Sequence, residues 1–175
     1  MPGHKVLDVG CGTGTLALWL KEHEPQAVVK GLDGDQRILS IARRKAEKLQ
    51  SGVFFDRGLS FEMPYRGEQF DRCLSSLFFH HLTDENKEKT FMEMFRVLRN
   101  DGEIHIADWG KPGNLIMRLL SYQTQLFDGF STTNCNMKGR LPELMKSVGF
   151  HNVAIRENVQ TIFGTMALYK ATKYL

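Results

Sequence analysis

The chain has 175 residues, the size of one ordinary domain and enough to bury a sizeable hydrophobic core. Apolar residues make up 42% of it and charged residues 25%, which excludes a disordered, collagen-like or supercharged chain. The 23 Lys and Arg against 20 Asp and Glu leave a formal net charge of only +3, so the composition does not suggest a dedicated nucleic-acid binder.

Short apolar runs alternate with segments of helical periodicity in the first half of the chain. A first helix is expected to stop at Pro25, and Asp35 is the expected N-cap of a second helix. The predicted strands of this half lie at residues 5–9, 27–33, 53–55 and 70–77.

The alternation continues beyond the fourth strand. A long helix is predicted to open at Thr83 or Asp84 and to end at residues 100–102, where Asn, Asp and Gly follow one another. A fifth strand is predicted at 103–108, and helical periodicity returns at 115–127.

The C-terminal segments complete the pattern. Residues 141–148 predict a short helix that ends at Gly149. The last two strands, near 153–156 and 162–171, must pair antiparallel, because a parallel crossover needs about a dozen residues. Strands that alternate with helices in this order predict an α/β fold, with a mostly parallel sheet covered on both faces.

Domain organisation and location follow from simple observations. No repeat, linker or low-complexity segment occurs, so one domain over 1–175 is expected, and the first strand begins too early to leave room for an N-terminal lid. The three cysteines are few and far apart, which favours a reducing compartment. Neither an apolar leader nor a run of about 18 apolar residues is present, so we expect a cytoplasmic protein without a membrane span.

The glycine-rich segment after the first strand carries the most information. Gly10, Gly12 and Gly14 would bring a ligand close to the backbone N–H groups of a helix N-terminus. Dinucleotide folds do the same, but their third glycine is replaced here by Thr15. Asp8 suits a cationic amino group better than a pyrophosphate. An NAD(P)-binding oxidoreductase is therefore a disfavoured alternative.

A set of short segments occurs in one order along the chain: 8–14, 31–33, 64–65, 70–71, 80–82, 96–99 with Gly102, and 149–150. Together they resemble the class I S-adenosylmethionine-dependent methyltransferases, most closely the small-molecule branch that includes ubiquinone and menaquinone biosynthesis enzymes. The resemblance implies a Rossmann-like three-layer αβα sandwich with a seven-stranded, mostly parallel sheet whose last strand is antiparallel. It also implies S-adenosylmethionine as the cofactor.

The resemblance assigns one group of residues to the methionine and ribose part of that cofactor. Asp8 would lie near its amino group and Asp33 would hold the ribose hydroxyls, although either could simply serve a helix start. The glycines of the loop, together with Gly34 beside Asp33, would line the same part of the cofactor.

A second group is assigned to the cofactor's two ends. Ile38 would pack on the adenine, and Leu59-Ser60 stands where the family commonly has Asp-Ala. Leu59 cannot accept a hydrogen bond from the adenine amino group, so that contact must come from the backbone or from Ser60. Ser76 and Leu77 would lie beside the methionine moiety.

Methyl transfer needs a positioned nucleophile, and it needs a base only if the nucleophile carries a proton that must leave. His81 and Asp108 are the candidate catalytic residues, because both follow strands at the edge where ligands bind in open α/β sheets. His81 could instead pack its loop, and Asp108 could start the next one. No third ligand accompanies the histidine pair, so no metal site is predicted.

The acceptor is expected to be a small molecule, with O- or C-methylation preferred and no nucleic acid as substrate. No Asn/Asp-Pro-Pro motif follows the fourth strand, and the basic residues at 43–48 fit a solvated helix face. Residues 112–138 are a possible substrate cap with an apolar lining, or else a further covering helix. The proposed lining is Met117, Tyr122, Phe127 and Phe130.

The early start of the first strand suggests an unusually open pocket, a lid supplied by another chain, or a truncated sequence. A homodimer or a partner chain could supply the lid. Alternatively, the chain is a non-catalytic or partner-dependent cofactor-binding module.

Overall fold

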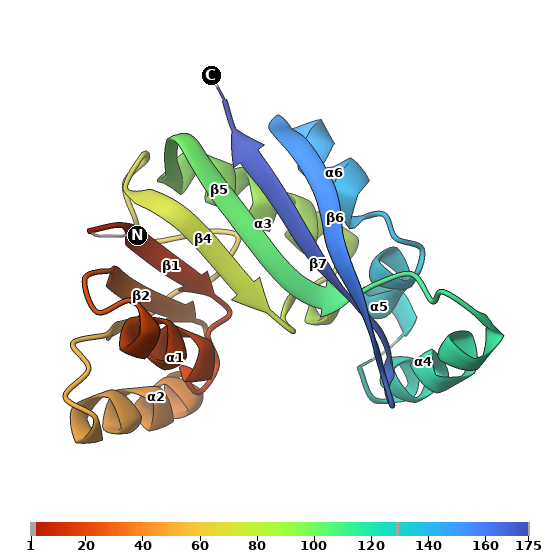
Figure 1. Cartoon of the computed structure of the whole chain (residues 1–175), viewed down its shortest axis with the longest axis horizontal. Coiled ribbons are helices and arrows are strands. Elements are labelled where there is room, and N and C mark those ends of the chain that lie inside the picture. Colours follow the sequence, from red (N-terminus) through yellow and green to blue (C-terminus); the bar gives the residue numbers. More distant parts are fainter. Residues whose placement is uncertain (1–2, 129, 175) are drawn as a thin grey trace.

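The computed structural model describes residues 3–128 and 130–174, except for the side chains of 122–131. A seven-stranded sheet has the order β3-β2-β1-β4-β5-β7-β6. Strand β7 runs antiparallel to β5 and β6, whereas the other neighbouring strands pair in parallel (Figure 1). This arrangement confirms the predicted α/β sheet. The strands are β1 (Lys5–Val9), β2 (Val28–Asp33), β3 (Phe54–Arg57), β4 (Phe70–Ser76), β5 (Leu98–Trp109), β6 (Phe150–Thr161) and β7 (Gly164–Lys173).

Helices lie on both faces of the sheet (Figure 1). On one face α1 (Thr15–His23) and α2 (Gln36–Lys48) cover β1 to β3, and on the other lie α3 (Asp84–Val97), α5 (Phe130–Met137) and α6 (Leu141–Val148). Successive side chains of a strand alternate between faces. Val6 therefore packs in the core cluster under α1 and α2, whereas Leu7 and Val9 pack in the cluster under α3, α5 and α6. The predicted three-layer sandwich is therefore present.

Helix ends follow the expected local chemistry. The Asp35 carboxylate accepts hydrogen bonds from the backbone N–H groups of Arg37 and Ile38 at the start of α2. The Thr83 hydroxyl similarly caps α3. Gly149 ends α6 with φ of 108°, a conformation that side chains other than glycine disfavour. These predicted boundaries are confirmed.

The structure differs from the prediction at three places. Helix α5 follows α4, although helical periodicity was predicted only for 115–127, and β5 begins at Leu98, before the predicted turn. The last hairpin is longer than predicted, with a turn of only Ile162 and Phe163 between its strands. Strand β6 is an exposed edge strand, so it shows no alternation of polar and apolar residues, and pairing with β7 decides its length.

Helix α4 (Leu115–Asp128) lies on the side of the sheet formed by the carboxyl ends of the parallel strands β1, β4 and β5 (Figure 1). The short helix η1 (Phe79–His81) follows β4 at the same edge. Of the helices that the structure describes, none has the length and apolar character that a membrane crossing requires.

Candidate functional site

The glycine loop joins β1 to α1 at this edge of the sheet. The backbone N–H groups of Gly10 and Cys11 both donate to the Leu32 carbonyl, which ties the loop to the end of β2. A Cβ on Gly10 would lie 2.2 Å from the Phe78 ring, whereas a Cβ on Gly12 would meet no atom within 4 Å. The loop is therefore packed tightly at Gly10 and faces open space at Gly12.

The Asp33 carboxylate is fixed beside the loop from two sides. Its Oδ2 accepts the Gly12 N–H at 2.9 Å, and its Oδ1 accepts the Asp35 N–H at 2.9 Å. A carboxylate has about four acceptor positions, so this one retains positions for two hydroxyl donors. Asp33 is thus positioned to accept hydrogen bonds from a ribose diol.

Asp8 lies beneath the loop and is only 1% exposed. Its Oδ2 has no hydrogen-bond partner. Asp8 also lines a cavity of about 370 Å³ together with Gly10, Trp19 and Ser76. A buried carboxylate oxygen that borders a cavity is complementary to a ligand ammonium group, because an unpaired buried charge is costly. The site therefore fits the cationic amino-acid end of the expected cofactor.

Burial raises the pKa of Asp8 to about 7, helped by the negative charge of Asp33 and opposed by a hydrogen bond from the Ala17 backbone. The ligand-free native protein therefore holds a proton that the unfolded chain loses near pH 4, so the Asp8 contribution to stability decreases as pH rises from about 4 to about 7.

We expect the unfolding free energy of the wild type, minus that of Asp8→Asn, to fall by about 1.4 kcal/mol for each pH unit across this window. Urea denaturation of both proteins at several pH values measures the difference. A constant difference between pH 4 and pH 7 would contradict the raised pKa.

The wall on the side expected to hold adenine is apolar. Leu59 is 48% exposed, and a Cβ on Gly34 would lie 3.6 Å from its Cδ2. Ile38 is half-buried in the first turn of α2. The Ser60 hydroxyl points into the core, where it pairs with the Thr90 hydroxyl at 2.9 Å. The Ser60 hydroxyl is therefore engaged in the core, which leaves the backbone of this loop as the expected polar partner of an adenine edge.

Asp108 lies at the end of β5 and is 0% exposed. Its Oδ2 accepts the N–H groups of Phe78 and Phe79 at 3.0 and 2.7 Å. Its Oδ1 accepts hydrogen bonds from His80 Nδ1 at 2.8 Å and from Asn136 Nδ2 at 3.1 Å. The carboxylate is thus occupied in holding the connection between β4 and η1, and it is not presented at the surface.

The two histidines of η1 are placed differently. His80 is 4% exposed and bound to Asp108, whereas His81 is exposed, with the two ring centroids 4.0 Å apart. Leu77, just before η1, has a positive φ of 50° and a largely exposed side chain. Of the two predicted catalytic residues, His81 is therefore the one that solvent or a substrate can reach.

Two lysines hold loops of this region in place, and no sequence motif indicates their roles. The Lys45 ammonium binds the Thr13 carbonyl and hydroxyl in the glycine loop, although its helix face was expected to be solvated. Fully buried Lys87 donates to the carbonyls of Leu82 and Thr132, both at 2.5 Å, and so connects η1 to α5. A lysine on an amphipathic helix gives no signal for such a role.

The predicted cap includes α4 and α5. Met117 is buried, and the Ser121 hydroxyl lies 2.8 Å from where a Cβ of Gly164 would stand, so α4 packs on the tip of the last hairpin. The side chains of Tyr122, Phe127 and Phe130 lie outside the described residues. Among the side chains that are described, no three of His, Cys, Asp and Glu are grouped to hold a metal ion.

Comparisons with known proteins point to one family. A family model described as a methyltransferase domain matches residues 6–102. Methyltransferase GfsG of Streptomyces halstedii is 37% identical over 132 residues, which are 74% of this chain and 45% of that protein. Demethylmenaquinone methyltransferase of Lactobacillus johnsonii is 30% identical over 174 residues, covering 87% of this chain and 70% of the relative.

A solved structure shows the same fold. Phosphoethanolamine N-methyltransferase 2 of Haemonchus contortus, bound to phosphomonomethylethanolamine and S-adenosylhomocysteine, superposes with a TM-score of 0.80 at 17% identity. The match covers 99% of this chain and 50% of that one. The chain also spans about half the length of most of the curated relatives that it matches.

Proposed function

The chain belongs to the S-adenosylmethionine-dependent methyltransferases, and from that premise we propose that it transfers the cofactor's methyl group to a small-molecule acceptor, with O- or C-methylation preferred. The observation that carries the proposal is the buried Asp8 carboxyl group, which lines a cavity beside the glycine loop and whose Oδ2 has no hydrogen-bond partner. A turn built only for packing would not leave an unpartnered carboxyl oxygen buried beside a cavity.

Each residue of this site would contact a different part of the cofactor. The glycine loop presents backbone N–H groups, Asp8 would orient the amino group, and Asp33 would hold the ribose. Leu59 and Ile38 would enclose the adenine. When bound, S-adenosylmethionine supplies an activated methyl group, so the protein's largest contribution is to hold the acceptor in line with it.

We propose a proton-accepting role for His81 and a positioning role for Asp108. His81 is exposed at the edge of the sheet where the cofactor site lies. Asp108 fixes the backbone of η1 through Phe78 and Phe79, so it acts through the position of the histidines rather than by touching the acceptor.

We propose that the chain forms a single domain over 1–175, and that residues 112–138 determine which methyl acceptor binds. Helix α4 lies beside the ligand edge of the sheet, and Lys87 secures α5 to η1. The relative that acts on demethylmenaquinone favours a quinol or phenol-like acceptor, whose proton would require a base. We also propose that a second copy or another chain completes the closure of the site. The proposed location of the protein is the cytoplasm.

We expect His81→Ala to lower the methyl-transfer rate by about 100-fold while leaving S-adenosylhomocysteine affinity unchanged. The measurement is transfer of a radiolabelled methyl group, screened first with the wild type against phenols, quinols and keto acids. His151→Ala, an exposed histidine on β6, is the matched control and should retain the wild-type rate.

Two outcomes would change this view. An unchanged rate in His81→Ala would remove its role as a base but leave the family assignment intact. Cofactor binding without transfer to any acceptor class, alone or with a cell extract, would favour a non-catalytic or partner-dependent module.

A further inference from the structure

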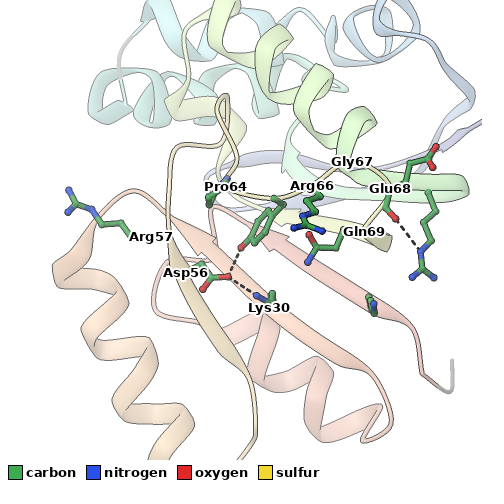
Figure 2. Close-up of a pocket in the computed structure, with 11 residues that line it drawn as sticks. Lys30, Asp56, Arg57, Pro64, Arg66, Gly67, Glu68 and Gln69 are labelled. Carbon is green, nitrogen blue, oxygen red and sulfur yellow. Dashed lines mark hydrogen bonds and ion pairs between the residues drawn. The ribbon is translucent and has the colours of Figure 1, made fainter.

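A second cavity, of about 810 Å³, lies away from the cofactor site. It is bounded by β1 to β3 and by the loop that follows β3, and Figure 2 shows its lining. Lys30 points to this side because its neighbours Val29 and Gly31 face the cluster under α1 and α2. None of its lining residues also lines the cavity at Asp8. The two cavities are therefore separate sites.

The lining of this second cavity is strongly cationic. Five basic side chains against two acidic ones leave an excess of three positive charges, as large as the formal net charge of the whole chain. The basic residues are Lys5, Lys30, Arg57, Arg66 and Arg99, and the acidic ones are Asp56 and Glu68.

Part of this charge is already neutralised. Asp56 accepts from the Lys30 ammonium and from the Tyr65 hydroxyl, both at 3.0 Å. Arg99 pairs with Asp71 at 3.0 Å. These contacts hold the walls of the cavity in place. They also neutralise Asp56, which is one of the two carboxylates that line the cavity.

Other cations remain without an acidic partner. Among the described residues, no carboxylate lies within ion-pair distance of Lys5, Arg57 or Arg66. Figure 2 shows Arg66 and Gln69 pointing into the space between the loop and the strands, whereas Arg57 points away from it. The cavity thus offers the Arg66 guanidinium, the Gln69 amide and the Lys5 ammonium to an anion.

We propose that this cavity binds a small phosphorylated molecule. A guanidinium matches two phosphate oxygens at once, and an ammonium adds a point charge. The site is concave and its positive charge is local. A nucleic acid would instead need an extended basic stripe, which a chain of net charge +3 does not favour.

Calorimetry with sodium pyrophosphate, at constant ionic strength and without metal ions, tests the proposal. The pocket variant is Lys5→Gln with Arg66→Gln, and the matched control is Arg44→Gln with Lys48→Gln on the exposed side of α2. We expect the pocket variant to bind pyrophosphate at least about tenfold more weakly and the control to stay within about twofold. S-adenosylhomocysteine affinity should be unchanged in both.

Three results would overturn the proposal. They are no wild-type binding at about 5 mM pyrophosphate, equal weakening in both double variants, and tight binding of a single-stranded oligonucleotide without binding of pyrophosphate. If the pocket variant has a lower Tm than the wild type, Arg66→Gln alone can replace it, because this substitution changes only an exposed loop side chain. Its pyrophosphate affinity is then compared with that of the control. The test does not depend on methyl transfer, so its failure leaves the proposed function standing.

Discussion

We expect Asp33→Ala to lower the affinity for S-adenosylhomocysteine by at least about 100-fold, as measured by calorimetry. The substitution removes the proposed acceptor for both ribose hydroxyls, and each charge-assisted hydrogen bond contributes about 1.5–3 kcal/mol. It also releases the N–H groups of Gly12 and Asp35, which the carboxylate now fixes at 2.9 Å. The loop would therefore lose both a ligand contact and its anchor.

Asp35→Ala is the matched control, because Asp35 is two residues away and caps α2 instead. It should cost about 1 kcal/mol of unfolding free energy with little change in cofactor affinity. Similar losses of affinity in both variants would show that the effect arises from the helix start and not from a ribose contact.

Gly10→Ala should cost about 4 kcal/mol of unfolding free energy. The new Cβ would lie 2.2 Å from the Phe78 ring, and the φ of 69° at this residue is unfavourable for alanine. Phe78 precedes η1 and its N–H binds Asp108, so a shift of the ring would also displace the histidines. Urea denaturation measures the cost, and loss of cofactor binding should accompany it.

Gly12→Ala provides the comparison. Its φ of 53° carries a similar backbone penalty, but a Cβ would meet no protein atom within 4 Å. We expect a stability loss of about 1–2 kcal/mol together with a large loss of affinity, because the methyl group would project toward the ligand. Equal destabilisation by the two alanines would contradict the packing described at Gly10.

The parts of the fold that the sequence predicts depend on local chemistry. Asp35 and Thr83 act on backbone groups two or three residues away, so their role is visible in the sequence alone. The alternation of strand and helix periods predicts the parallel sheet in the same way. The glycine spacing and Asp33 predict where the proposed cofactor site lies, because a strand end, a turn and a helix start are adjacent in the chain.

The parts that the sequence does not predict depend on contacts between distant segments. Asp108 contacts His80 and Asn136, each 28 residues away, and these contacts keep its carboxylate buried rather than exposed at the site. The Ser60 hydroxyl is likewise engaged by Thr90 from α3. Lys87 and Thr132 are 45 residues apart. No pattern of local periodicity encodes such pairs.

The central claim is that this chain holds an adenosyl cofactor between Asp8, the glycine loop and Asp33. Calorimetry of the wild-type chain with S-adenosylhomocysteine, and separately with NADH, tests it most directly. We predict saturable one-to-one binding of S-adenosylhomocysteine, abolished in Gly12→Ala, and no binding of NADH. Binding of NADH alone, or S-adenosylhomocysteine binding that survives in both Asp33→Ala and Gly12→Ala, would contradict it.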